Sequence, residues 1–281
     1  MNRIRCFLLP VFVLVIESLC FCQAPAGFIQ RQLSPGLTWY SLEGDTLWGV
    51  SQCINVLEVD PERYALRLVS GREELKTLST FAKESGAVAA VNGNFFHTVE
   101  GGSVCFTKVD GVITDTTRYN LPPRWFLDQL DDAALVSDGQ EIKIILCPPD
   151  GWKSAVQYST IISAGPPLLI DGKLLPISDQ SFNTRRYGRT AVGITAGHRM
   201  ILLTVSGNAP LSQGFTMPEL QKMMSLFGCV GALNFDGGSS ATMWIGALPE
   251  NKLVSHPGKG RGKSQHNERK VANSLIIIPR R

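Results

Sequence analysis

The stretch V-G-A-L-N-F-D-G-G-S-S-A-T-M, residues 230–243, holds the most informative pattern in this chain. It begins as an apolar strand, presents one carboxylate at Asp236 and continues with four very small residues before a second apolar segment. Because glycine has no Cβ, the main chain at Gly237 and Gly238 can come close to a ligand. Successive N–H groups in such a turn form a concavity that suits an anion. A carboxylate beside such a turn predicts the floor of an active site.

The composition indicates an exported protein that does not bind nucleic acid. The formal net charge is +3 over 281 residues, which is close to neutral and argues against nucleic acid as a general partner. Residues 1–24 have the positive start, the short apolar run and the small-residue end of a signal peptide, so export is predicted. The apolar run is too short to span a bilayer. A lipid anchor at Cys20 or Cys22 is the remaining link to a membrane, and its flanking residues fit such a signal poorly.

Cysteine and histidine spacing gives no metal pattern. The four cysteines after the signal peptide, Cys53, Cys105, Cys147 and Cys229, lack the close pairs that metal sites use. Cys53 and Cys229 lie in apolar segments, which favours buried free thiols. The four histidines form no H-x-H or H-E-x-x-H pattern. No cofactor is expected, and a hard cation held by Asp236 and backbone oxygens is left as an open alternative.

Short apolar segments separated by turn signals predict an α+β protein, a single domain of mixed, largely antiparallel β-sheets with a few helices. N-terminal strands are expected over residues 25–76, leading into a main domain over residues 77–281. Strands are predicted over residues 48–59, 64–69, 87–91, 104–109, 133–136, 142–146, 190–195, 200–205, 230–235, 241–245 and 275–278. Hairpins are predicted at Asp110-Gly111, Asp138-Gly139 and Asp171-Gly172, and at Gly197.

Two helices are predicted, over residues 78–84 and 217–227. Thr216 and Glu219 form a capping box at the start of the second helix, where each side chain satisfies an N–H group of the other residue. Apolar residues then recur at helical spacing, and Gly228 ends the helix. Met223 and Met224 belong to this apolar face, so they are predicted to pack in the core.

Three further polar patterns adjoin predicted strands. Asn92-Gly93-Asn94-Phe95-Phe96 combines amides with aromatic rings, which suits a sugar, although Asn-Gly at a strand end is more often only a tight turn. Arg189 precedes a buried strand and can present its guanidinium to phosphate or carboxylate, with a structural salt bridge as the alternative. The segment 268–274 brings charges into the last strand, and a gatekeeper role against aggregation explains these charges equally well.

Taken in order, these patterns resemble the phosphodiester glycosidase family. The resemblance runs from about Leu78 onward and rests on six pieces in sequence. They are residues 90–96 (A-V-N-G-N-F-F), 162–168 (I-S-A-G-P-P-L), 189–193 (R-T-A-V-G), the helix at 216–227, residues 232–243 and residues 268–275. Two positions depart from the family pattern. Ser239 replaces a third glycine, and Ser206-Gly207-Asn208 replaces Asp-Gly-Arg, which bears on the identity of the substrate.

The resemblance implies hydrolysis of a sugar-1-phosphodiester of the N-acetylglucosamine type at the glycosyl–oxygen bond. Asp236 is then the catalytic carboxylate, Glu268 a second acid, and Arg189 a cation for the phosphate, which leaves as a stabilised anion. The resemblance places the substrate-binding residues at Asn92, Gly93, Asn94, Phe95, Phe96, Thr190, Asn234, Gly237, Gly238, Ser239, Ser240, Thr242, Arg269 and Asn273. The expected partner is a sugar-phosphate small molecule or a glycan.

Three other classes of function fit parts of the sequence. An exported carbohydrate- or phosphate-binding module without turnover would use the same turn and the same aromatic pair. A serine hydrolase acting through Ser239 or Ser240 lacks a G-x-S-x-G motif. A metal-dependent phosphodiesterase lacks sufficient clustered ligands.

Overall fold

The computed structural model describes residues 24–72, 74–118, 129–207, 211–248, 253–255 and 268–280. These residues form three antiparallel β-sheets and three α-helices, which confirms the predicted α+β class. The predicted signal peptide, with Cys20 and Cys22, lies outside the described residues. Within the described part of the chain, no helix is both long and apolar enough to cross a membrane.

The largest sheet has eight strands in the order β1-β2-β3-β14-β13-β15-β11-β12. Their bounds are β1 (Ile29–Ser34), β2 (Leu37–Leu47), β3 (Val50–Val59), β14 (Met200–Val205), β13 (Arg189–Thr195), β15 (Cys229–Phe235), β11 (Pro167–Ile170) and β12 (Lys173–Leu174). In this sheet, the individual strands predicted from the sequence do not include β1, β2, β11 and β12. Strand β1 is the largely exposed edge strand, and residues 43–46 of β2 are exposed, so the apolar pattern of both strands is weak.

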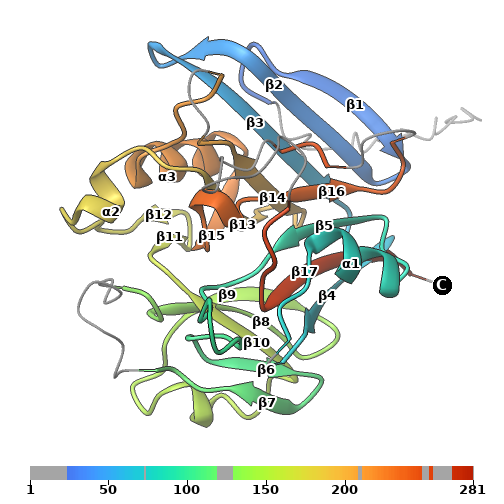
Figure 1. Ribbon diagram of the computed structural model, residues 1–281, viewed down its shortest axis with the longest axis vertical. Coiled ribbons are helices and arrows are strands. Elements are labelled where there is room, and N and C mark those ends of the chain that lie inside the picture. Colours follow the sequence, from blue (N-terminus) through green and yellow to red (C-terminus); the bar gives the residue numbers. More distant parts are fainter. Residues whose placement is uncertain are drawn as a thin grey trace, which may run out of the picture.

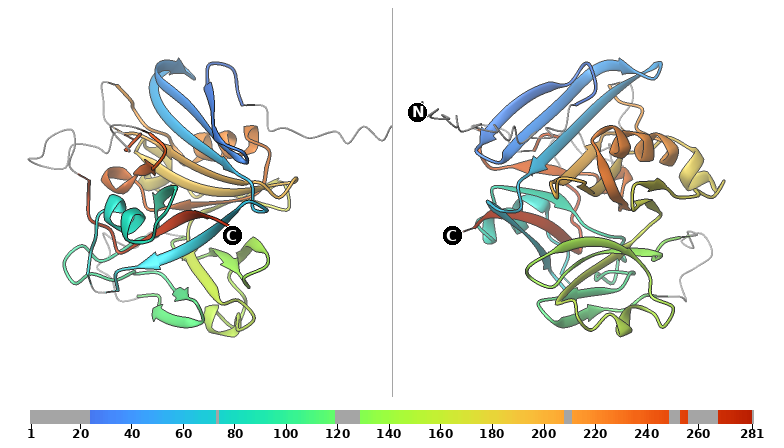
Figure 2. Two further views of the ribbon diagram at one scale, coloured as in Figure 1. Left: turned by 90° about the vertical axis from the view of Figure 1, so that its right-hand side faces the viewer. Right: turned by 180° about the vertical axis from the view of Figure 1, so that it is seen from behind.

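Two smaller sheets complete the fold. The four-stranded sheet has the order β16-β5-β17-β4, and the five-stranded sheet has the order β7-β6-β10-β8-β9. Their bounds are β16 (Met243–Ile245), β5 (Ala89–Asn92), β17 (Asn273–Pro279), β4 (Tyr64–Ser70), β7 (Val112–Asp115), β6 (Thr107–Val109), β10 (Thr160–Ala164), β8 (Ala133–Ser137) and β9 (Ile142–Leu146). The eight-stranded sheet extends toward one end of the molecule and the five-stranded sheet toward the other, with the four-stranded sheet beside both (Figures 1 and 2). Strands β8, β9 and β10 of the five-stranded sheet also contact β15 of the large sheet directly.

The four predicted hairpins are all present. They join β6 to β7, β8 to β9, β11 to β12 and β13 to β14. At two of them Asp110 and Asp171 have positive φ angles of 47° and 49°, and each is followed by a glycine with positive φ. Aspartate and glycine tolerate this left-handed backbone, which matches the twist of the paired strands.

One large core fills the space where the three sheets meet. It combines residues such as Val192 and Leu233 of the large sheet with Val91 and Ile277 of the four-stranded sheet and Ile162 of the five-stranded sheet. Burial of apolar side chains supplies the main driving force for this packing. The described strands of the four-stranded sheet are therefore fixed against the central strands of the large sheet.

The three helices cover outer faces of the sheets. Helix α3 (Met217–Leu226) packs on the large sheet with Met223 and Met224 buried, and it has the predicted capping box between Thr216 and Glu219. Helix α1 (Leu78–Glu84) covers the four-stranded sheet, and α2 (Ser181–Thr184) is a single turn. All four described cysteines are free, and Cys53 and Cys229 are buried as predicted.

Candidate active site

Four strand ends from two sheets converge at one place. Strand β5 ends at Asn92 beside the start of β17, and β13 starts at Arg189 beside the end of β15. Two main-chain hydrogen bonds join these pairs: the Asp236 N–H donates to the Gly93 carbonyl at 3.2 Å, and the Gly93 N–H donates to the Asn273 carbonyl at 3.0 Å. Motifs separated by up to 180 residues in the sequence therefore share one region of the molecule.

Asn92 connects this region through its side chain. Its Nδ2 donates to the Asp236 carbonyl at 2.7 Å and to the Gly93 carbonyl at 3.3 Å. Its Oδ1 accepts from the Thr190 hydroxyl at 2.7 Å and from the Thr242 N–H at 3.1 Å. Asn92 is fully buried. The amide that the sequence analysis assigned to sugar hydroxyls is thus occupied by the protein itself, and it positions the turn that carries Asp236.

Asn94 and Asn273 form a second buried amide cluster. Asn273 Nδ2 donates to Asn94 Oδ1 at 2.7 Å, and the Asn94 main-chain N–H donates to Asn273 Oδ1 at 3.1 Å. Asn94 Nδ2 donates to the Ser163 carbonyl at 2.9 Å, which ties the cluster to the five-stranded sheet. These amides also differ from the predicted sugar contacts, because Asn273 bonds to Asn94 and Asn94 bonds to the five-stranded sheet.

The glycine-rich turn after β15 is tight because main chains touch there. A Cβ on Gly237 would lie 2.4 Å from the Gly188 carbonyl oxygen, which no side chain could tolerate. Gly238 has a φ of +60° and starts the short 3-10 turn Gly238–Ser240. The N–H groups of Gly237, Gly238 and Ser240 donate to Asp236 Oδ1 (2.9 Å), the Gly188 carbonyl (2.7 Å) and the Gly237 carbonyl (3.1 Å). The predicted anion cradle of free N–H groups is therefore absent at these three positions.

The Asp236 carboxyl is the chemically distinctive group of this turn. It is partly exposed, yet the surrounding protein removes enough water to raise its pKa from 3.8 to about 6. Three groups oppose this rise by favouring the ionised form: the Ser240 hydroxyl, the Arg269 guanidinium and the Gly237 N–H. Ser240 Oγ is buried and has no partner at ordinary hydrogen-bond geometry, so it is available to the carboxylate. A carboxyl that titrates near neutral pH suits proton transfer.

Arg189 starts β13 as predicted but does not present its fork at the surface. It is fully buried, and its Nε and Nη2 donate to the carbonyls of Phe215 (2.9 Å), Phe182 (2.5 Å) and Arg185 (3.1 Å). The guanidinium carbon lies 4.6 Å from the Phe182 ring centroid and 5.2 Å from that of Tyr187. Burial lowers its pKa to about 10. Among the described residues it has no ion-pair partner, and its Nη1 is buried without a hydrogen bond.

Arg269 is the exposed cation beside the carboxylate. Its Nη1 donates to the Ser239 hydroxyl at 2.6 Å, and its guanidinium carbon lies 5.3 Å from the Phe96 ring centroid. Its charge also lowers the pKa of Asp236, so the guanidinium lies close enough to influence the carboxylate electrostatically. Ser239, where the family pattern has glycine, thereby anchors an arginine.

Glu268 lies at the start of helix α1, in contrast to its predicted role as a second acid. Its Oε1 accepts the Ser79 N–H at 2.9 Å, and its Oε2 accepts the Ser79 hydroxyl. Negative charge is favourable at this end of a helix because the first N–H groups point toward it. The carboxylate thus fixes the segment that carries the neighbouring Arg269.

Two further predicted site residues, Phe95 and Asn234, are buried close to this region. Phe95 packs against Phe182, Val104 and Cys105, with the Phe95 and Phe182 ring centroids 6.1 Å apart. Asn234 Nδ2 donates to the Gly165 carbonyl at 2.7 Å, and its Oδ1 is buried without a partner. Sequence reasoning missed Phe182 and Tyr187 around Arg189, Ser103 beside Asn94, and Cys105, whose raised pKa is partly due to Asp236. Each of these is an ordinary residue in its own segment, and only the fold brings it here.

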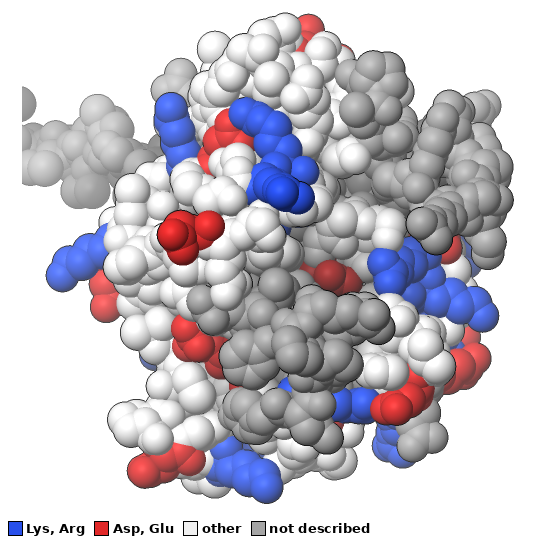
Figure 3. Space-filling model, turned by 60° about the vertical axis from the view of Figure 1, so that its left-hand side comes forward, with Lys and Arg blue, Asp and Glu red and all other residues white. Residues whose placement is uncertain are grey.

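The molecular surface supports a recessed acidic site. Figure 3 shows a hollow on one face with an acidic side chain at its bottom and basic side chains at one edge. Within the described ranges, no cluster of three or more His, Cys, Asp or Glu residues could hold a metal ion. The arrangement combines a desolvated carboxyl, an exposed arginine and an aromatic ring, which are suited to acid–base chemistry on an anionic ligand.

Solved structures of other proteins are similar to this chain in their overall fold. A hypothetical protein from Synechocystis matches with a TM-score of 0.66 and 15% identity over 92% of this chain, and the match spans 64% of that protein. A putative exported protein from Burkholderia pseudomallei matches with a TM-score of 0.56 and 18% identity, over 81% of this chain and 74% of that one.

A third structure is the catalytic domain of zebrafish N-acetylglucosamine-1-phosphodiester alpha-N-acetylglucosaminidase, auto-inhibited by its pro-peptide. It matches with a TM-score of 0.64 and 19% identity, over 92% of this chain and 87% of that one. The family model for phosphodiester glycosidases matches residues 85–278, so the chain belongs to the phosphodiester glycosidase family. No curated protein sequence gives a significant match.

Proposed function

We propose that this protein is an exported hydrolase that cleaves a sugar-1-phosphodiester at the glycosyl–oxygen bond, releasing free sugar and a phosphate monoester. Membership of the phosphodiester glycosidase family supports this kind of activity. The observation that carries the proposal is the Asp236 carboxyl, whose pKa is raised to about 6 beside Arg269. Export rests on the signal-peptide pattern of residues 1–24. The sugar is proposed to be of the N-acetylglucosamine type.

Asp236 acts in its ionised form. The leaving phosphate monoester departs as a stabilised anion, so it needs little help from a general acid. The step that needs help is at the anomeric carbon, where positive charge develops as the bond breaks. The carboxylate either stabilises that charge directly or takes a proton from the attacking water. Both roles need the negative form, and at neutral pH most of a group with a pKa near 6 is ionised.

Two arginines supply the positive charge that the phosphate requires. Arg269 is exposed, lies over Phe96 and acts electrostatically on Asp236. Arg189 is buried without a carboxylate partner in the described part of the chain, and its main chain lies beside Gly237 of the turn. Such preorganised charge favours an anion without any rearrangement during the reaction. Phe96 is buried beneath Arg269, so its ring positions the guanidinium and is not open to the sugar.

A substrate screen tests the function directly. Purified protein is incubated with α-linked sugar-1-phosphodiesters and with nucleotide sugars, and free reducing sugar is measured over time, with Asp236→Asn protein as the control. Release of sugar and a phosphate monoester that depends on Asp236 supports the proposal. Stoichiometric binding measured by calorimetry, with no turnover on any compound, would instead identify a binding module.

The pH dependence of kcat/KM should follow the ionisation of Asp236. Since the ionised Asp236 is the active form, activity should rise with pH, about tenfold per unit below pH 6, and level off above it. The stability of the fold should change in the opposite sense. The folded pKa lies above the ordinary value of 3.8, so the contribution of this group to stability is present at low pH and is lost as the pH rises from about 4 to about 6. An activity that falls as the pH rises through 6 would contradict the role of the ionised form.

Glu268→Gln separates a positioning role from a catalytic one. Because both carboxylate oxygens contact Ser79, we expect kcat to stay within a few-fold of wild type and the free energy of unfolding to fall by about 1 kcal/mol. Ser79→Ala is the matched variant, since it removes the hydroxyl partner from the other side. Turnover assays and thermal denaturation give both values. A loss in kcat comparable to that of Asp236→Asn would make Glu268 a second catalytic acid.

A further inference from the structure

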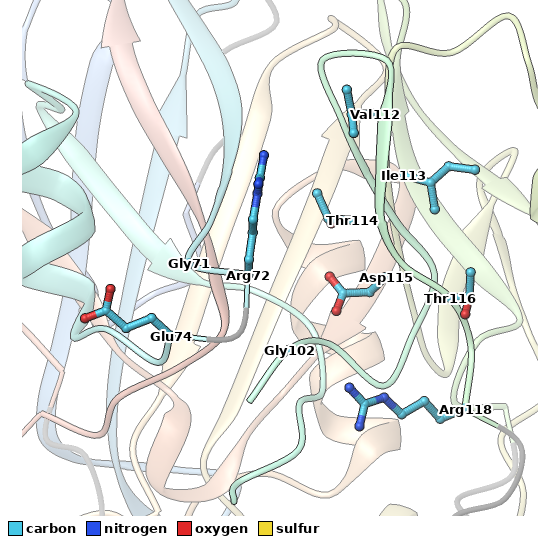
Figure 4. A pocket seen from close by; sticks show the side chains of 10 residues that line it. All are labelled: Gly71, Arg72, Glu74, Gly102, Val112, Ile113, Thr114, Asp115, Thr116 and Arg118. Atoms are coloured by element: carbon cyan, nitrogen blue, oxygen red, sulfur yellow. The ribbon is translucent and has the colours of Figure 1, made fainter. Parts of the chain in front are cut away.

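A second cavity lies outside the region of Asp236. It has a volume of about 780 Å³ and is bounded by the loop after β4 and by the β6–β7 hairpin (Figure 4). This volume is within the range of small-molecule sites. The residues that matter for its chemistry are Arg72, Glu74, Gly102, Asp115, Thr116 and Arg118. None of the patterns used to identify the family contributes to it.

Arg72 gives the cavity an uncompensated positive charge. Arg118, the other cation of the lining, already donates to Glu100 at 2.9 Å and to the Gly101 carbonyl at 3.3 Å. The Glu74 carboxylate points away from the other side chains in Figure 4 and lies 3.9 Å from Lys76. Within the described ranges, no hydrogen bond, ion pair or ring contact uses the Arg72 guanidinium. An anionic group is the natural partner for such a cation.

Asp115 gives the same cavity an unsatisfied acceptor. Its Oδ1 accepts the Ser103 N–H at 2.9 Å, whereas its Oδ2 is buried and has no partner at ordinary hydrogen-bond geometry among the described residues. The carboxyl points toward Gly102, where a Cβ would lie 2.8 Å from Oδ1 (Figure 4). Burial raises the pKa of Asp115. A buried acceptor without a donor is costly, and a ligand hydroxyl would remove that cost.

We propose that this cavity binds an anionic saccharide, with the anionic group at Arg72 and a hydroxyl donating to Asp115 Oδ2. No simple anion would serve both groups, because the carboxylate of Asp115 repels an anion that brings no donor. The exposed hydroxyl of Thr116 adds a further polar contact. The mixed charge of the lining thus fits a sugar that carries a phosphate or a carboxylate.

The cavity also lies next to the proposed catalytic region. Gly102 precedes Ser103, which pairs with Phe96, and Phe96 lies under Arg269, which donates to Ser239. An extended ligand could therefore reach from Asp236 to Arg72. Resting on the proposed function, the inference assigns the cavity to the part of the substrate that leaves with the phosphate, and that part is a second saccharide that carries an anionic group of its own.

Calorimetry tests the binding without any need for turnover. Glucose 6-phosphate and glucuronate are titrated into the full protein, with glucose and inorganic phosphate as comparison ligands. The variants are Arg72→Asn, which suits the positive φ of 56° at this position, Asp115→Asn, which keeps the Oδ1 acceptor, and Arg67→Asn as the matched control at an exposed arginine outside the cavity lining. We expect Arg72→Asn and Asp115→Asn each to weaken binding of an anionic sugar about tenfold. Arg67→Asn should leave it unchanged.

Three results would overturn the assignment. The first is that neither anionic sugar binds. The second is that Arg72→Asn and Asp115→Asn both bind the anionic sugars as tightly as the wild type does. The third is that inorganic phosphate binds as tightly as glucose 6-phosphate. Thermal denaturation of each variant checks that the fold is retained. A preference for glucose 6-phosphate over glucuronate would identify the anion as phosphate, and the reverse preference would identify it as carboxylate.

Kinetics separate this inference from the proposed function. In Arg72→Asn, kcat/KM should fall about tenfold for a sugar-1-phosphodiester whose partner is a second sugar with its own carboxylate or phosphate, and it should not change for the corresponding methyl phosphodiester. Equal losses on both substrates would contradict the subsite. Anionic sugars that bind through Arg72, together with no hydrolysis of any phosphodiester, would support the cavity and reject the proposed hydrolase.

Discussion

Asp236→Asn is expected to lower turnover about a hundredfold or more while making the folded protein more stable. The asparagine keeps the shape of the side chain and can still accept the Gly237 N–H through Oδ1. It removes the negative charge, which is the form we assign to catalysis. It also removes the cost of ionising a carboxyl whose pKa is raised to about 6, so the free energy of unfolding at pH 7 should rise by up to about 3 kcal/mol.

Steady-state kinetics on a sugar-1-phosphodiester and thermal denaturation at several pH values measure the two effects. The gain in stability should shrink toward pH 4, where the wild-type carboxyl is protonated as well. Asp171→Asn is a suitable kinetic control because it makes the same chemical change at an exposed hairpin residue whose positive φ asparagine also tolerates. Activity within a few-fold of wild type in Asp236→Asn would remove the carboxylate from the mechanism.

Gly93→Ala is expected to destabilise the fold by about 3–5 kcal/mol, from overpacking and from loss of the buried amide pairing. A Cβ at this position would lie 1.8 Å from Asn273 Oδ1. That oxygen accepts the Asn94 N–H, and the same asparagine pair joins the strand ends around the site. Asn273 must move to make room for the methyl group. This movement breaks its hydrogen bonds to Asn94, which hold the ends of β5 and β17 together near Asp236.

Chemical denaturation gives the size of this effect, and Gly197→Ala is its matched control. Gly197 lies in a hairpin, its φ is outside the positive range, and the nearest neighbour of an added Cβ is Thr195 Oγ1 at 3.9 Å. The control should therefore cost little. A Gly93→Ala protein as stable as Gly197→Ala would show that the amide cluster can rearrange freely around an added methyl group.

Local sequence patterns account for the elements that depend on near neighbours. The capping box at Thr216 needs only contacts within one helical turn, and the turns at Asp110-Gly111 and Asp171-Gly172 need only a backbone that tolerates positive φ. Strand β1 was not predicted individually because it is an edge strand with few buried positions, and in β2 the exposed residues 43–46 interrupt the apolar alternation. The order of the motifs predicted the family, which a match over residues 85–278 confirms.

The amino-acid sequence by itself determined the α+β class, the family and the segments that meet at the site. It could not determine which side chains are free there. Asn92, Asn94 and Asn273 are polar residues in a turn-like pattern, and only the packing of three sheets decides that their amides bond to the protein. The same packing buries Arg189 and turns Glu268 toward Ser79, while it leaves Asp236 partly exposed with a raised pKa. The physical reason is that hydrogen-bond partners and water access depend on residues distant in the chain, and folding alone brings these together.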